Sequence, residues 1–114
     1  MILIIGGKYQ GKLEVAEEIV SRAADACLEI EDRCHEKVRR QISLGMSLED
    51  ILAFWEGEDF QDRILIFDEV SMGVVPMEKG DRIFREACGQ VMRILAGKAD
   101  QVYRVFCGIP LRLK

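Results

Sequence analysis

The sequence predicts an α/β protein with a mainly parallel sheet, because short apolar runs alternate with longer segments of helical periodicity. The runs Met1–Ile5 and Ile64–Phe67 are continuous, as in strands that are buried on both faces. At 114 residues the chain has the length of one domain, so we expect residues 1–114 to fold as a single compact unit.

The first half of the chain predicts two strands and two helices. A helix is expected to begin after Lys12 and to turn its apolar side chains toward the sheet. Cys27–Ile30 is expected to form a short strand, and Asp32 to cap a second helix that ends at Gly45. The expected apolar faces of the two helices consist of Leu13, Ala16, Ile19, Val20 and Ala23, and of Cys34, Val38 and Ile42.

The second half continues the alternation. Ser47 and Asp50 give an S-x-x-D start for a third helix, and Ile64–Phe67 follows as the strongest strand. The segment Asp68–Pro76 is expected to be an irregular loop, at the position where α/β proteins bind ligands. The remaining elements are a helix from Asp81 to Gly97, a strand at Val102–Cys107 and a turn with an extended tail at Gly108–Lys114.

Composition excludes several classes of partner. The chain has 16 basic and 20 acidic residues and a net charge of −4, so it favours neither nucleic acid nor an anionic membrane. Its longest apolar run is far shorter than the ~20 residues of a membrane span, and we expect a soluble, untargeted, cytoplasmic protein. Four cysteines, which form no C-x-x-C pair, are expected to be reduced and mostly buried: Cys27, Cys34, Cys88 and Cys107.

A phosphate-binding loop of the form G-x-x-x-x-G-K follows the first strand and opens the first helix. Glycines let the backbone approach a phosphate, and N–H groups at a helix N-terminus bind it together with the lysine ammonium. Nucleotide binding is therefore assigned to Gly6, Gly7, Lys8, Gly11 and Lys12. The alternative is a glycine turn with a purely structural role.

Leu13 departs from this motif, which carries the Mg²⁺-binding hydroxyl of Ser or Thr at the same position. An isobutyl group cannot ligate a cation, so GTP or ATP is the expected ligand and Mg²⁺ a doubtful one. Asp68 and Glu69 follow the strand Ile64–Phe67 and are the expected metal ligands at the sheet edge. The alternative is that they are ordinary solvated charges of a loop.

Two further features are weaker candidates. A second acidic group after the Cys27–Ile30 strand is interpreted as solvated charge; it consists of Glu29, Glu31 and Asp32. His35 is the single histidine, so any imidazole nucleophile or acid–base catalyst would have to be this residue. Its neighbours Glu36, Arg39 and Arg40 on an amphipathic helix favour a surface position in ordinary salt bridges.

Motifs near both ends of the chain resemble the adenosylcobinamide kinase / adenosylcobinamide-phosphate guanylyltransferase family. They are I-G-G-x-x-x-G-K at residues 5–12, D-E-V-S-M-G-V-V-P at 68–76, R-x-F-R at 82–85, A-D-x-V-Y at 99–103 and G-I-P-L-R-L-K at 108–114. The resemblance implies a RecA-like P-loop fold and cytoplasmic cobalamin biosynthesis. It also implies ATP- or GTP-dependent phosphorylation of a cobinamide side chain, followed by GMP transfer, and association of copies into a homo-oligomer, often a trimer.

The chain is shorter than the family pattern between the first helix and Ile64, where family members carry a guanylyl-accepting histidine and a second metal-binding strand. One register places His35-x-x-x-Arg39 on the family's H-x-x-x-R segment. The other places Leu28–Asp32 on the metal-binding strand and leaves the histidine segment deleted. We favour the second, because Cys27–Ile30 leads directly into a helix without room for both segments.

The sequence therefore predicts a nucleotide-binding protein of cobalamin biosynthesis, with GTP or ATP as ligand and a cobinamide as the acceptor implied by the resemblance. Whether it is an active transferase is left open. The alternative, which Leu13 favours, is a non-catalytic relative that uses the fold for assembly or regulation in cobamide metabolism.

Overall fold

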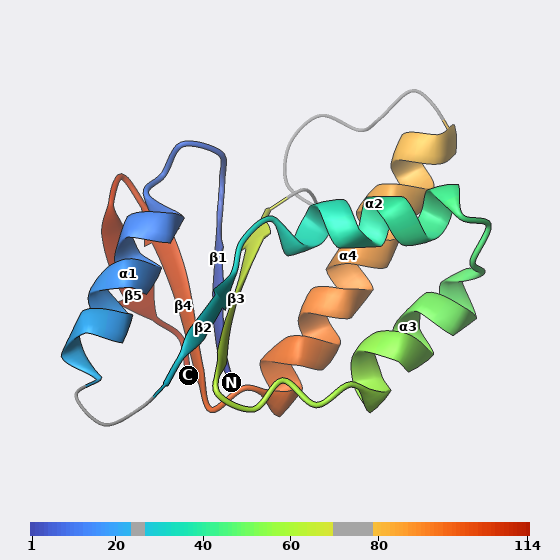
Figure 1. Ribbon diagram of the computed structural model, residues 1–114. Coiled ribbons are helices and arrows are strands. Elements are labelled where there is room, and N and C mark those ends of the chain that lie inside the picture. The colour runs from blue at the N-terminus through green and yellow to red at the C-terminus, as the bar shows by residue number, and fades with distance from the viewer. Residues whose placement is uncertain (24–26, 70–78) are drawn as a thin grey trace.

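A five-stranded sheet with four helices makes up the part of the chain that the computed structural model describes, which is residues 1–23, 27–69 and 79–114 (Figure 1). The α/β class predicted from the sequence is thus confirmed. The strands are β1 (Ile2–Gly6), β2 (Glu29–Glu31), β3 (Arg63–Asp68), β4 (Gln101–Phe106) and β5 (Ile109–Arg112). The helices are α1 (Lys12–Arg22), α2 (Cys34–Ser43), α3 (Leu48–Gly57) and α4 (Lys79–Lys98).

The strands lie in the order β2-β3-β1-β4-β5, and the first four are parallel. The central strand β1 pairs with β3 and β4, so that Gly6 lies opposite Asp68. The expected extended tail is in fact strand β5, which pairs antiparallel with β4. The two strands are joined by Cys107 and Gly108, whose φ angles of 50° and 75° suit the tight turns of β-hairpins.

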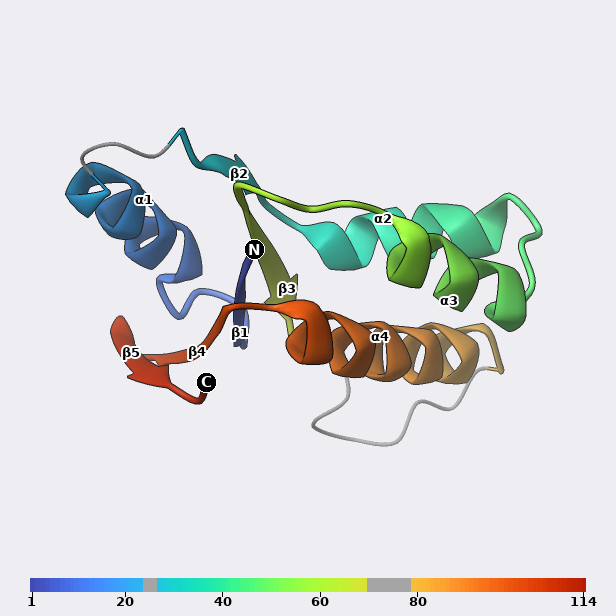
Figure 2. The ribbon, with the colours of Figure 1, turned by 90° about the horizontal axis from the view of Figure 1, so that it is seen from below.

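Helices cover both faces of the sheet (Figure 2). Helix α1 packs on one face, where the buried core consists of Ile4, Val15, Ala16, Ile64, Ile66 and Val105. Helices α2, α3 and α4 cover the other face, around the fully buried ring of Trp55. The indole N–H of Trp55 donates to the Oε1 atom of the buried Gln41 at 2.8 Å, so this core carries a satisfied polar group.

The helix starts differ in how well the sequence predicts them. Ser47 caps α3 as expected, because its side chain accepts a hydrogen bond from the Asp50 N–H at 3.1 Å. The expected cap at Asp32 is wrong: Arg33 occupies the N-cap position of α2 with a φ of 53°. The expected start of the last helix at Asp81 is also wrong, since α4 begins at Lys79. Most of the expected loop Asp68–Pro76, from residue 70 onward, lies outside the described residues.

The four cysteines, all of them within the described residues, are free thiols as expected. Only Cys34 and Cys88 are buried, however, whereas Cys27 and Cys107 are exposed, so the expectation of mostly buried thiols is wrong. Burial raises the pKa of both Cys34 and Cys88 to about 12.

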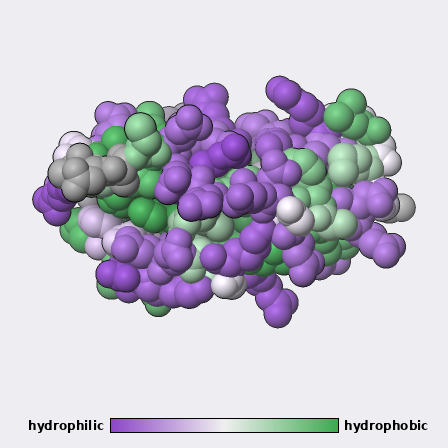
Figure 3. All heavy atoms as spheres, turned by 60° about the horizontal axis from the view of Figure 1, so that its bottom comes forward, coloured by the Kyte–Doolittle hydropathy of each residue, from purple (hydrophilic) through white to green (hydrophobic). Residues whose placement is uncertain are grey.

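The molecular surface is consistent with the charged composition. Hydrophilic side chains cover most of the face shown in Figure 3, with apolar side chains between them. Among the described helices, none has the length and apolar character that a membrane span requires.

Candidate functional site

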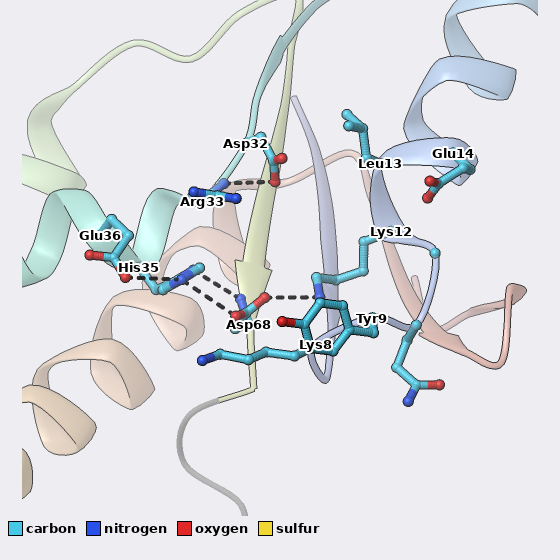
Figure 4. A pocket seen from close by; sticks show the side chains of 12 residues that line it. Lys8, Tyr9, Lys12, Leu13, Glu14, Asp32, Arg33, His35, Glu36 and Asp68 are labelled. Carbon is cyan, nitrogen blue, oxygen red and sulfur yellow. Dashed lines mark hydrogen bonds and ion pairs between the residues drawn. The ribbon is translucent and has the colours of Figure 1, made fainter.

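A pocket of about 360 Å³ lies at the carboxyl ends of β1 and β3 (Figure 4). The loop between β1 and α1, the segment that joins β2 to α2, and the end of β3 all contribute to it. Its lining consists of Lys8, Tyr9, Gln10, Gly11, Lys12, Leu13, Glu14, Asp32, Arg33, His35, Glu36 and Asp68. Carboxyl ends of parallel strands are where open α/β sheets bind ligands.

Two of the predicted glycines have a steric reason in the structure. A Cβ atom on Gly6 would lie 2.6 Å from the carbonyl oxygen of Val105, so a side chain does not fit where β1 leaves the sheet. Gly11 is the N-cap residue of α1 and has a φ of 88°, which glycine adopts without strain. No side chain of the described residues caps α1. Its N-cap and first three residues, Gly11–Glu14, line the pocket, so the uncapped N-terminus of α1 lies where a phosphate site requires it.

Lys12 ends this loop and is the first residue of α1, and it is only 8% exposed. Its Nζ atom is 2.9 Å from the Oδ1 atom of Asp68 and donates a hydrogen bond to the carbonyl oxygen of Gly7. The ammonium is thus held inside the loop by one carboxylate and one carbonyl. A phosphate that entered the pocket would meet a lysine that is already in position.

His35 lies on the other side of Asp68, and the expected surface position of this histidine is wrong. The residue is 6% exposed, and its Nε2 atom lies 3.4 Å from the Oδ2 atom of Asp68 and 3.5 Å from the Oε1 atom of Glu36. Its Nδ1 atom accepts a hydrogen bond of 3.3 Å from the Asp68 N–H, which places the proton of the neutral ring on Nε2. Burial lowers the pKa of His35, while the Asp68 carboxylate opposes that effect.

Leu13 lines the pocket and is 38% exposed, so it does not belong to the buried face of α1 where the periodicity placed it. Val15 occupies that face instead. The side chain of Leu13 supplies no oxygen to the pocket. The exposed Lys8 and the fully exposed Tyr9 lie on the loop between β1 and α1 and also line the pocket (Figure 4).

The expected metal ligands are engaged with cations of the chain. Asp68 contacts Lys12, and the Oε1 atom of Glu69 lies 3.3 Å from the Nε atom of Arg104. Among the described residues, no three side chains of His, Cys, Asp or Glu lie close enough together to hold a metal ion. Leu13, in the place of the usual Ser or Thr, offers no oxygen ligand for Mg²⁺. The metal-binding role of Asp68 and Glu69 stays a prediction.

The second acidic group is dispersed. Glu29 is exposed, Glu31 lies 2.9 Å from the guanidinium of Arg63, and only Asp32 lines the pocket. Asp32 accepts a hydrogen bond of 2.8 Å from the Arg33 N–H through its side chain. The interpretation of this group as ordinary charge agrees with that arrangement for Glu29 and Glu31.

Tyr9, Gln10 and Arg33 are among the residues of the site that were not found from the sequence. Tyr9 and Arg33 have φ angles of 60° and 53°, in a region that residues other than glycine seldom adopt. Gln10 contacts the β4–β5 turn, about a hundred residues away in the sequence. Neither property follows from residue type or local spacing, so no sequence signal pointed to these residues.

Comparison with known proteins agrees with the resemblance seen in the motifs. The family model described as cobinamide kinase / cobinamide phosphate guanyltransferase matches residues 29–113. This range begins after the loop Gly6–Lys12, so the assignment of nucleotide binding depends on the residues and geometry of the loop itself.

Two curated relatives match over part of the chain. Over 51 residues it is 41% identical to the bifunctional adenosylcobalamin biosynthesis protein CobU of Salmonella typhimurium (strain LT2), and 39% identical to the protein of the same name from Escherichia coli (strain K12). Each match covers 45% of this chain and 28% of the relative's length. Since the family model matches well over half of the residues, the chain belongs to the cobinamide kinase / cobinamide phosphate guanyltransferase family.

Proposed function

We propose that the chain binds a nucleoside triphosphate, GTP or ATP, with its phosphates in the loop Gly6–Lys12. The observation that carries this proposal is the buried Lys12 ammonium, which Asp68 and the Gly7 carbonyl hold at the uncapped N-terminus of α1. Backbone N–H groups and one fixed cation are what a phosphate chain requires. Lys8 and Arg33 add two exposed cations at the same pocket.

The family membership supports a role in cobalamin biosynthesis. The proposed activity is transfer of a phosphoryl group from the nucleotide to a cobinamide, as the family description suggests. In this proposal Lys12 neutralises charge on the phosphates, and the N-terminus of α1 orients them. The ion pair between Lys12 and Asp68 forms again when the ligand leaves. A cytoplasmic location and a homo-oligomeric state belong to the same proposal.

Guanylyl transfer through His35 is not part of the proposal. A histidine that accepts GMP must present an unprotonated ring nitrogen to the α-phosphorus. In His35 the Nδ1 atom accepts the Asp68 N–H, and the Nε2 atom carries the proton of the neutral ring. Although the ring lines the pocket, neither nitrogen offers a free lone pair to the α-phosphorus in this arrangement.

Calorimetric titration of the chain with GTP, GDP and ATP, each with Mg²⁺ and with a chelator, tests the binding step. We expect at least one of them to bind with a dissociation constant in the millimolar range or tighter. A second assay with γ-labelled nucleotide and a cobinamide tests transfer. Binding without transfer would favour the non-catalytic alternative, and no binding by any of the three nucleotides would contradict the proposal.

A further inference from the structure

We propose that Gln10 is a positioning residue, which fixes the phosphate-binding loop by joining it to the turn between β4 and β5. This inference rests on the proposed function, because it concerns how the same loop is prepared for its ligand. Neither the motif nor the family match assigns Gln10 or the turn between β4 and β5 to the site.

Gln10 accepts two hydrogen bonds from the turn. Its side-chain Oε1 atom accepts the Cys107 N–H at 2.6 Å, and its backbone carbonyl accepts the Gly108 N–H at 2.7 Å. Both donors are backbone groups, so the link depends on the path of the turn and not on the side chain of Cys107. One residue of the loop thus holds two consecutive N–H groups of the hairpin.

The backbone of β4 and its turn also lies close to the loop at two of its three glycines. The Cβ position of Gly6 lies 2.6 Å from the Val105 carbonyl oxygen, and that of Gly11 lies 3.2 Å from the Cα atom of Gly108. The loop is therefore enclosed by β4 and the turn on one side, and by Asp68 through Lys12 on the other.

The turn is built to present these two N–H groups. Cys107 and Gly108 both have positive φ, at 50° and 75°, and the flanking residues Phe106 and Ile109 pair directly across the hairpin. A two-residue turn with positive φ at both positions matches the twist of the strands that flank it. The loop that it contacts contains Tyr9 at a φ of 60°, a conformation that the loop alone would not favour.

A loop that is already held in its binding conformation binds phosphate more tightly, because no free energy is lost in ordering the loop when the ligand binds. Gln10→Met tests this, since methionine keeps the length of the side chain and removes the acceptor. Gln61→Met is the matched control, because Gln61 is exposed before β3 and does not line the pocket. GTP affinity is measured by calorimetry, thermal stability by calorimetric unfolding, and exchange of the Gly108 amide hydrogen by NMR.

We expect Gln10→Met to weaken GTP binding about 5- to 20-fold, with the unfolding midpoint nearly unchanged, and to speed exchange at Gly108. That amide is informative because its acceptor, the backbone carbonyl of residue 10, is still present in the variant. Its exchange rises only if the loop moves away from the turn. Gln61→Met should change none of the three quantities.

Two results would overturn the proposal while leaving nucleotide binding intact. One is equal GTP affinity in Gln10→Met and the parent chain. The other is weaker affinity with unchanged Gly108 exchange, which would mean that Gln10 contacts the ligand directly and does not act through the turn. Failure of the parent chain itself to bind GTP, GDP or ATP would instead refute the proposed function, and the positioning role with it.

Discussion

The Nζ atom of Lys12 lies 2.9 Å from the Oδ1 atom of Asp68, at the point where β1 and β3 end side by side. The register places Gly6 opposite Asp68, so the carboxylate lies next to the first residue of the phosphate-binding loop. The same carboxylate contacts His35 through its second oxygen. Asp68 thereby connects the loop to helix α2, and any ligand that takes Lys12 changes the surroundings of all three side chains.

His35 is predicted to form no covalent adduct with GTP. Attack of a ring nitrogen on the α-phosphorus, with pyrophosphate leaving, would form a P–N bond, but His35 is 6% exposed and its Nδ1 atom accepts the Asp68 N–H. After incubation with α-labelled GTP, the protein should carry no acid-labile label. A label that appears in the parent and disappears in His35→Asn would contradict this prediction and restore the first sequence register.

Leu13→Ser is predicted to make nucleotide binding depend on Mg²⁺. The serine restores an oxygen ligand at the first turn of α1, whereas the parent should bind GTP with little difference between Mg²⁺ and chelator. Because Leu13 is 38% exposed, the loss in stability should be only about 1 kcal/mol. Leu13→Ala is the matched control, since it removes the same apolar contact without adding an oxygen.

Titration of GTP with Mg²⁺ and with EDTA in all three proteins measures this effect. A strong Mg²⁺ dependence in the parent would show that another group, such as Asp68 or Glu69, holds the metal. The metal-binding prediction for these two carboxylates would then be correct.

Gly6→Ala is predicted to lower the free energy of unfolding by about 1–3 kcal/mol, the usual cost of forcing extra atoms into a packed site. The added Cβ atom would lie 2.6 Å from the Val105 carbonyl oxygen, so β1 or β4 must move. In contrast, Gly97→Ala in α4 meets no atom of the described residues within 4 Å and should stabilise the helix by about 0.5–1 kcal/mol. Urea denaturation compares the two, and equal effects would refute the steric reason for Gly6.

The free energy of unfolding is predicted to decrease at alkaline pH, because Cys34 and Cys88 are buried. Burial raises the pKa of Cys34 and of Cys88 from 9.0 to about 12, so above pH 9 the unfolded chain binds fewer protons than the folded one. The free energy of unfolding should therefore fall as the pH rises from 9 toward 12, by at most about 1.4 kcal/mol per pH unit for each thiol.

Urea denaturation between pH 7 and 11 measures this slope, with Cys88→Ala as the control that removes one thiol. The slope above pH 9 should be smaller in the variant, whatever its stability at pH 7. At pH 8, a thiol reagent should label Cys27 and Cys107 in the folded chain and all four cysteines after unfolding. Rapid labelling of Cys34 or Cys88 in the folded chain would contradict the burial on which this prediction depends.

Strands and loops that depend on local sequence patterns could be predicted from the sequence. Continuous apolar runs identify β1 and β3, and the glycines and lysine of residues 6–12 identify a loop that does lie at the pocket. Strand order, and hence the contact of Lys12 with Asp68, could only be inferred from the general geometry of parallel sheets. The RecA-like details beyond the α/β class rest on the family resemblance.

The remaining features depend on contacts between distant segments. His35 has charged neighbours along α2 and therefore resembles a surface residue, but the end of β3 buries it. Leu13 follows the apolar period of α1, yet the pocket at the helix start leaves it exposed. Arg33, and not the expected Asp32, is the N-cap residue of α2. Its φ is positive, a conformation that an arginine in the sequence does not indicate.

The measurement that tests the central claim most directly is calorimetric titration of GTP and ATP into the parent chain and into Lys12→Ala. Arg93→Ala, which removes one exposed positive charge on α4 away from the pocket, is the charge-matched control. Because Lys12 is the buried cation of the loop, we expect at least one nucleotide to bind the parent and Arg93→Ala alike, and to bind Lys12→Ala at least 10-fold more weakly. Equal affinity in the parent and in Lys12→Ala, or no binding to either, would contradict the assignment of this pocket to nucleotide phosphates.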